Sequence, residues 1–150
     1  MCSSDLIGVA ERHGIEKVKT IGDAYMAVIG GMASSGGDSK AAILFARDLI
    51  ADLEIIAADT GLPLKARIGV HTGPAVGGVI GSTRLAYDYW GDTMNVASRL
   101  QGHAPLNGIA VSEATWFQTR TLQDFEAQNV VLKGIGETRA YVALLGTIAQ

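Results

Sequence analysis

Asn95 and Arg99 are two polar residues spaced four apart in a stretch that is typical of a helix. Side chains at positions i and i+4 lie on the same face of a helix, so an amide and a guanidinium would be presented together. A guanidinium fork binds phosphate oxygens well and keeps its charge at physiological pH. The pair could therefore act on a phosphate. Alternatively, Asn95 simply faces solvent and Arg99 pairs with a nearby acid such as Asp92.

Asp23 is a second residue that could do chemistry, because it follows Gly22 between two stretches that favour β-strands. A carboxylate at the tip of a hairpin can offer hard oxygen ligands to Mg²⁺, and phosphoryl transfer needs such a cation near the phosphates. Gly-Asp is also good turn chemistry in its own right, so both interpretations are open. Lys19 lies roughly 13 Å from Asp23 along an extended strand, too far for the two side chains to share one small ligand group.

Three segments, two of which contain these residues, resemble the catalytic domain of class III nucleotidyl cyclases. They are EKVKTIGDAYMAV (Glu16–Val28), RIGVHTGPAVGGVIG (Arg67–Gly81) and YDYWGDTMNVASR (Tyr87–Arg99), in this order along the chain. The resemblance runs from about Gly14 to the C-terminus. It implies an enzyme that joins the 3′-hydroxyl of ATP or GTP to the α-phosphate of the same nucleotide.

The resemblance also implies roles for individual residues. Asp23 would bind Mg²⁺ or Mn²⁺, with a pair of ions expected in the intact domain. Asn95 would orient the ribose, and Arg99 would stabilise the pentacoordinate phosphate of the transition state. Lys133, in LKGIG, would bind phosphate, although Ile135 stands where the family often has a second basic residue.

Lys19 and Asp88 would read the purine base, again by resemblance. Asp88 can accept a hydrogen bond from the adenine N6 amine, and Lys19 can donate one to a ring nitrogen. Guanine presents a carbonyl and an N–H at those edges, and relatives that make cyclic GMP usually carry Glu and Cys instead. The two residues together favour ATP. Each alone could be ordinary, Lys19 as a strand lysine with its ammonium in water and Asp88 as a turn residue at a strand end.

The composition is that of a folded, weakly acidic domain. The chain has 150 residues, 48% of them hydrophobic and 18% charged, with a net charge of -3. This is enough for one sizeable core, and the absence of a Lys/Arg cluster disfavours binding to nucleic acid or to an anionic membrane surface. No apolar run reaches the length of a membrane span. The single cysteine, Cys2, excludes an internal disulfide and suits a reducing, cytoplasmic location.

The first residues look foreign to the rest of the chain. Residues 1–6, MCSSDL, have neither the basic start nor the apolar stretch of a signal peptide, and they are what a common sequencing adapter would encode. We therefore expect residues 1–6 to be non-native and residues 7–150 to form a single partial cyclase catalytic domain. That domain would lack a second metal-binding Asp, and this fragment alone is expected to be inactive. Alternatively, residues 1–6 are native and form an ordinary disordered terminus.

Strands mixed with two long helices indicate an α+β domain, with helices over an antiparallel sheet. The resemblance implies a ferredoxin-like sheet and the class III nucleotidyl cyclase fold, lacking the first strand and first helices. The glycines of residues 73–81 indicate close chain packing. Strands or extended segments are predicted at 16–21, 24–29, 64–71, 84–89, 108–111, 129–132 and 139–145, helices at 7–13, 38–58, 92–101 and 113–119, and a glycine-rich crossing at 72–81.

Two helices carry more specific expectations. Asp38 and Asp92 are expected to cap their helices. In the helix at 38–58, near-helical spacing predicts an apolar face made of Ala42, Leu44, Phe45, Leu49, Leu53 and Ile56.

These observations predict an adenylate cyclase catalytic domain that works as a homodimer with two composite sites. One subunit would bring the metal carboxylates, and the other would bring Lys19, Asp88, Asn95 and Arg99. Two alternatives remain, a non-catalytic cyclase-like module that binds nucleotide or regulates a partner, and a guanylate cyclase. The three histidines, His13, His71 and His103, have no metal-ligand spacing and are expected to be structural or solvated.

Overall fold

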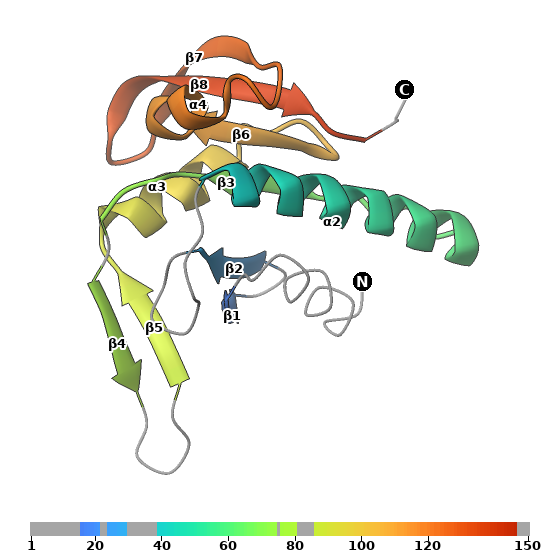
Figure 1. The fold of residues 1–150 in the computed structure, drawn as a ribbon, viewed down its shortest axis with the longest axis horizontal. Coiled ribbons are helices and arrows are strands. Elements are labelled where there is room, and N and C mark those ends of the chain that lie inside the picture. Colours follow the sequence, from blue (N-terminus) through green and yellow to red (C-terminus); the bar gives the residue numbers. More distant parts are fainter. Residues whose placement is uncertain (1–15, 22–23, 30–38, 75, 81–85, 147–150) are drawn as a thin grey trace.

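The computed structural model describes residues 16–21, 24–29, 39–74, 76–80 and 86–146. Their elements are, in chain order, β1 (Glu16–Ile21), β2 (Ala24–Val28), α2 (Ser39–Thr60), β3 (Arg67–Val70), β4 (Val76–Ile80), β5 (Ala86–Trp90), α3 (Asp92–Gln101), β6 (Gly108–Ser112), α4 (Glu113–Thr119), β7 (Glu126–Leu132) and β8 (Gly136–Leu144) (Figure 1). The predicted helix at 7–13, the Gly22-Asp23 turn and the cap at Asp38 lie outside the described residues.

A four-stranded sheet with the strand order β3-β6-β8-β7 forms the centre of the fold. β3 and β6 run parallel, whereas β8 is antiparallel to both β6 and β7. Parallel neighbours need a long crossover, and here β4, β5 and α3 lie between β3 and β6 in the chain. The α+β class is therefore confirmed. An antiparallel sheet was predicted, but the sheet is mixed, because β3 and β6 run parallel.

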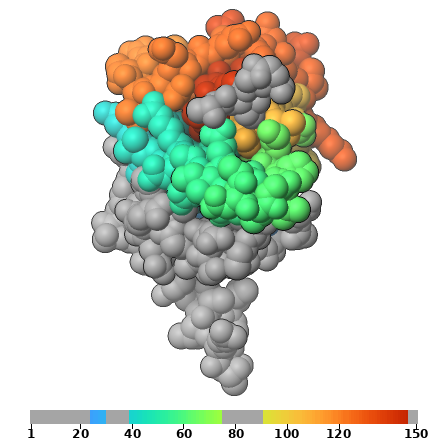
Figure 2. All heavy atoms as spheres, turned by 90° about the vertical axis from the view of Figure 1, so that its right-hand side faces the viewer, coloured from blue at the N-terminus to red at the C-terminus, as the bar shows by residue number. Residues whose placement is uncertain are grey.

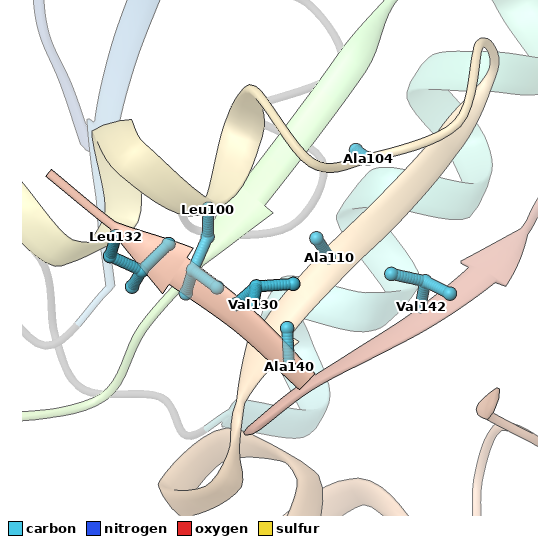
Figure 3. Close-up of a cluster of buried hydrophobic side chains, with 7 residues drawn as sticks. All are labelled: Leu100, Ala104, Ala110, Val130, Leu132, Ala140 and Val142. Carbon is cyan, nitrogen blue, oxygen red and sulfur yellow. The ribbon is translucent and has the colours of Figure 1, made fainter. Parts of the chain in front are cut away.

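Alternating residues of β6 and β8 point to the two faces of this sheet, as strand geometry requires. One face packs on α3 through a cluster in which Leu100 lies against Val130 and Leu132 of β7 (Figure 3). The opposite face packs on α2 and α4 through a second cluster. The first cluster consists of Leu100, Ala104, Ala110, Val130, Leu132, Ala140 and Val142, and the buried members of the second are Ile43, Ala46, Ile109, Val111, Tyr141 and Ala143.

The long helix α2 forms the middle of one face of the molecule (Figure 2). It ends at Thr60, two residues later than predicted, and Gly61 closes it with a φ of 71° and an N–H that donates to the carbonyl of Ala57. The prediction of its apolar face was partly wrong. Leu49 and Leu53 are buried, but Leu44 is 41% exposed and the remaining core positions are Ile43, Ala46 and Ile50. Apolar residues on several sides of the helix left the direction of its buried face ambiguous.

Two small antiparallel sheets complete the described fold. β1 pairs with β2 as predicted, from Glu16↔Val28 to Ile21↔Ala24. β4 pairs with β5, and this corrects the prediction that residues 72–81 form only a glycine-rich crossing. β3 is shorter than the predicted strand at 64–71, whereas β7 and β8 begin three residues earlier than predicted.

The start of α3 also differs from the prediction. Gly91, with a φ of 126°, is the N-cap, and it makes no side-chain capping hydrogen bond. Asp92 is the first residue of the helix instead of its cap. Its negative carboxylate still stabilises the helix, because it lies at the positive end of the helix dipole. α4 has a conventional cap, because the hydroxyl of Ser112 accepts from the Thr115 N–H at 3.4 Å.

Candidate active site

Asn95 and Arg99 both lie on α3, one helical turn apart, and both are exposed. The opposite side of the helix carries Thr93 and Leu100, which are buried at 8% and 1% exposure. Within the described residues, Arg99 forms no ion pair with Asp92, which was the alternative partner expected for it. Arg99 stands in the last turn of α3, where the helix dipole favours a positive charge. An amide and a guanidinium are therefore presented to solvent from one rigid element.

Lys133 is exposed in the turn that joins β7 to β8. Gly134 has a φ of 78°, and the N–H of Ile135 donates to the carbonyl of Leu132 at 3.0 Å, so the turn is tight. Ile135, which stands where the resemblance predicts a second basic residue, is 46% exposed. Because β7 contacts α3, this turn follows directly from a strand that borders the helix of Arg99.

Lys19 and Asp88 lie on two strands that contact each other, β1 and β5. The backbone of Lys19 pairs with Met26 just after an irregularity in the β1–β2 register, and Asp88 pairs with Gly78. β-bulges are common beside active sites because they redirect the strand locally. Residues 69 positions apart in the sequence are thus carried by neighbouring strands.

Asp23 lies outside the described residues, so its expected role as a metal ligand stays a prediction. The paired residues Ile21 and Ala24 leave only Gly22 and Asp23 between β1 and β2. Elsewhere in the described part of the chain, no group of three or more His, Cys, Asp or Glu side chains is placed to hold a metal ion. No described helix is long and apolar enough to cross a membrane.

The elements that carry the candidate residues form one connected series. β1 contacts β5, β5 contacts α3, and α3 contacts β7. The series includes the strands of Lys19 and Asp88, the helix of Asn95 and Arg99, and the strand that leads into Lys133. Arg99 and Lys133, two exposed basic residues whose side chains suit phosphate, thus lie on or directly after elements of this one series.

A chain of hydrogen-bonded hydroxyl groups connects α2, the segment after β3 and α4. The sequence alone did not predict this arrangement, since it shows only that Ser and Thr occur near the ends of these elements. Ser39 of α2 shares a hydrogen bond with Thr72 at 2.7 Å, and Thr72 shares one with Thr115 at 2.9 Å. The ring of His71 bonds through Nδ1 to the hydroxyl of Ser112 at 2.6 Å, which agrees with the structural role expected for this histidine. Partial burial lowers the pKa of His71 from its ordinary value.

A hollow of about 250 Å³ lies between α3, the start of α4 and the β7–β8 turn. His71 and Ser112 line one side of it, and Val96 and Leu100 of α3 line another. The buried side of the helix that carries Arg99 is thus next to the hydroxyl chain.

Comparisons with known proteins identify the family of the chain. The family model described as adenylate and guanylate cyclase catalytic domain matches residues 3–144. An adenylate cyclase of Mycobacterium tuberculosis is 35% identical over 136 residues, which cover 89% of this chain and 30% of that protein. The human guanylate cyclase soluble subunit beta-2 is 33% identical over 132 residues, which cover 86% of this chain and 21% of that protein. The chain thus spans less than a third of these relatives' length.

Solved structures agree with the sequence comparisons. The guanylate cyclase domain of RhGC from Catenaria anguillulae, crystallised in complex with GTP, superposes with a TM-score of 0.78 at 31% identity, covering 93% of this chain and 77% of that one. The adenylyl cyclase CyaB from P. aeruginosa has a similar fold, with a TM-score of 0.77 at 21% identity. With the family model matched over most of its length, the chain belongs to the family of adenylate and guanylate cyclase catalytic domains.

Proposed function

We propose that the protein is an adenylate cyclase, which converts ATP to cyclic AMP and pyrophosphate. In this reaction the ribose 3′-oxygen loses its proton and bonds to the α-phosphorus, while the bond from that phosphorus to the oxygen bridging to the β-phosphate breaks. The observation that favours ATP is the pair Lys19 and Asp88, two adenine-type residues on contacting strands. A cytoplasmic location is part of this proposal, and it fits a chain in which no internal disulfide can form.

In this proposal Lys19 and Asp88 select the purine base by matching its hydrogen-bond donors and acceptors. Asp88 accepts from the exocyclic amine of adenine, and Lys19 donates to a ring nitrogen. Guanine offers a carbonyl to the carboxylate and an N–H to the ammonium, so both groups would lose their partners. A buried polar group that is left unpaired costs about 1–3 kcal/mol, and a site built on such pairs can discriminate strongly between substrates.

Arg99 and Asn95 act on the sugar–phosphate part of the substrate in this proposal. Charge develops on the oxygens of the α-phosphate as it becomes pentacoordinate, and the Arg99 guanidinium stabilises that charge. Asn95 holds the ribose so that its 3′-oxygen faces the phosphorus. Their exposed positions on the short helix α3 support this assignment, since both side chains can reach a ligand from one rigid element.

Asp23 would hold the divalent cation that the family implies. The β1–β2 pairing leaves Asp23 in a two-residue connection, and a carboxylate is a hard oxygen ligand that suits Mg²⁺ or Mn²⁺. When bound, the ion neutralises charge on the triphosphate and favours ionisation of the hydroxyl. Lys133 would add a further positive charge for the phosphates from the β7–β8 turn.

The proposed active form is a homodimer in which each site is shared. Asp23 would act from one subunit, and Lys19, Asp88, Asn95 and Arg99 from the other. Two-fold symmetry then creates two equivalent sites. The guanylyl cyclase domain of the RhoGC fusion protein from Blastocladiella emersonii, which is 30% identical with a TM-score of 0.79, is described as a non-canonical dimer. The same domain is also described as monomeric in another structure.

The test of this proposal uses the parent protein, meaning this chain together with the sequence that flanks it in its gene. ATP and GTP are supplied at equal concentration with Mn²⁺, and cyclic AMP and cyclic GMP are quantified by mass spectrometry. We expect cyclic AMP to dominate, and Lys19→Glu combined with Asp88→Cys to erode that preference. Lys40→Glu, on the exposed surface of α2, controls for the change of charge.

Each outcome of this test has a clear meaning. Equal use of GTP by the unmodified protein would contradict the assignment of the base-reading pair. A double variant that keeps the full preference for ATP would do the same. If neither cyclic nucleotide is formed, the non-catalytic module becomes the better account of the family membership.

A further inference from the structure

The backbone of α3, the helix that carries Asn95 and Arg99, lies directly against the backbone of β3. A Cβ added to Gly69 would come within 2.9 Å of the Cα of Gln101, and closer still to the carbonyl oxygen of Ala97 and the amide nitrogen of Gln101. Backbone atoms cannot turn aside as the end of a flexible side chain can. Only a glycine at position 69 therefore lets α3 sit at its present depth on the sheet.

The first turn of α3 is held separately by the segment that follows β3. Thr93 is buried at 8% exposure, and its hydroxyl donates a hydrogen bond to the carbonyl of Pro74. A Cβ on Gly73 would lie 2.8 Å from the hydroxyl oxygen of Thr93, so this approach also depends on a glycine. The two contacts, at Gln101 and at Thr93, lie at opposite ends of the ten-residue helix and together fix its depth and its tilt.

The residues that make these contacts lie opposite the proposed catalytic residues. Thr93, Ala97 and Gln101 are spaced by four, so they form one line along α3 that faces β3 and its extension. Asn95 and Arg99 are each offset by two residues from that line, which is about 200° around the helix. A short helix moves as a rigid body, so a change in the seating of one side displaces the side chains on the other.

We infer that Gly69, Gly73 and Thr93 are positioning residues, which set the place of Asn95 and Arg99 without touching the substrate. This inference rests on the proposed function, since it gives α3 its catalytic task. A displacement of about 1 Å in a reacting or stabilising group can lower a rate by about a hundredfold. The loss should appear in kcat, because Arg99 is proposed to act in the transition state and Lys19 and Asp88 in binding.

The experiment compares Thr93→Val with Thr93→Ser in the parent protein. Valine keeps the shape of threonine but leaves the Pro74 carbonyl without its donor, whereas serine keeps the hydroxyl. We expect Thr93→Val to lower kcat for cyclic AMP formation at least about tenfold while KM for ATP changes less than about threefold. Thr93→Ser should recover most of the lost kcat.

Two glycine variants form a matched pair, one in β3 and one at the C-cap of α3. Gly69→Ala should lower kcat more than Thr93→Val does, because its Cβ meets the α3 backbone. Gly102→Ala is the control, since the φ of Gly102 is -67° and an added Cβ there meets only the Arg99 carbonyl oxygen at an ordinary 3.5 Å. It should leave kcat unchanged. If Gly69→Ala does not fold, the Thr93 pair still decides the matter.

Hydrogen exchange of the α3 amides provides a readout that needs no catalysis. Thr93→Val should speed exchange in the first turn of α3, and Thr93→Ser should not. If the unmodified protein makes no cyclic AMP, the proposed function fails, and the exchange rates alone decide whether Thr93 seats the helix. If the unmodified protein is active and Thr93→Val changes neither kcat nor exchange, the positioning inference fails alone. A loss of stability with unchanged kcat would also overturn it.

Discussion

The side-chain oxygen of Asn107 accepts a hydrogen bond from the backbone N–H of Ala66 at 2.9 Å. The backbone N–H of Asn107 in turn donates to the carbonyl of Ala66, and the carbonyl of Asn107 accepts from Leu145 and Gly146 at 3.0 Å each. Asn107 is 1% exposed and has a φ of 54°, a conformation that asparagine tolerates better than most residues. One residue, through its side chain and its backbone, therefore links the starts of β3 and β6 to the end of β8.

Asn107→Ala should lower the free energy of unfolding by about 2–4 kcal/mol, because it leaves the partly buried Ala66 N–H without its side-chain acceptor and strains the backbone. Asn107→Gly should cost less, since glycine adopts the positive φ freely. Urea unfolding of the chain measures both. Asn129→Ala, at an exposed position of β7, is the control and should stay within about 0.5 kcal/mol of the unmodified chain. Equal losses for alanine and glycine would show that the backbone conformation contributes nothing.

Much of the fold follows from local sequence signals, and the exceptions have physical causes. β1, β2, α3, β6 and α4 were predicted with boundaries within about one residue, because turn and cap residues mark their ends. β4 was missed because its centre is Gly77-Gly78, which has little strand propensity of its own. Its strand conformation comes from pairing with β5, which no local pattern encodes.

The site shows the same division between local and tertiary information. Motifs identified Asn95 and Arg99, and helical spacing placed them on one face. The contact between the strands of Lys19 and Asp88 depends on tertiary structure, as does the seating of α3 on Gly69. Close packing was expected for the glycines of residues 73–81, and Gly73 does lie against Thr93. Nothing in the sequence indicated that β3 itself approaches the helix backbone.

The packing of α3 on the sheet predicts a large loss of stability for Leu100→Ala. Leu100 is 1% exposed and lies against Val130 and Leu132 (Figure 3). Removing a buried leucine side chain costs about 2–5 kcal/mol, because transfer energy is lost and a cavity remains. Leu106→Ala is the matched control, since Leu106 is 48% exposed. A difference in urea midpoint that is no larger for Leu100→Ala than for Leu106→Ala would contradict this packing.

The environment of His71 predicts a dependence of stability on pH. Burial lowers the pKa of His71 below 6.5 in the folded chain, whereas in the unfolded chain the imidazole titrates near its ordinary value. Between the two pKa values the unfolded state binds more protons, so stability falls as the pH drops through this window. His71→Asn, which cannot titrate, should flatten that part of the profile. Urea midpoints between about pH 7.5 and about pH 5.5 measure it, and parallel profiles for the two proteins would exclude the effect.

The charge of Arg99 is expected to matter more than its volume. In the parent protein, Arg99→Ala should lower kcat by about 10²–10³, the usual loss for a group that stabilises transition-state charge. Arg99→Lys should recover only part of the rate, because an ammonium lacks the planar fork. Ser98→Ala, at the adjacent exposed position of α3, is the control and should keep the full rate. Steady-state assays with ATP measure all three. Full activity of Arg99→Lys would mean that a point charge suffices.

In the proposed dimer, ATP is cyclised at sites shared between two copies of the protein, with Asp23 and Arg99 acting from opposite subunits. Asp23→Ala and Arg99→Ala homodimers of the parent protein should each keep no more than about 1% of the unmodified activity, because every site lacks one essential group. In a mixed dimer, one site inherits both changes, whereas the other takes Asp23 from one chain and Arg99 from its partner. About half the dimers in a random mixture are mixed and each has one intact site, so about a quarter of the unmodified activity should return.

The decisive measurement is therefore cyclic AMP formation by the mixed variants, with subunit exchange followed independently by a fluorescent label on each. Recovery to about a quarter of the unmodified rate as exchange proceeds is the predicted result. Complete exchange with activity still at background would contradict the shared site, and the chemistry would then have to lie within one subunit.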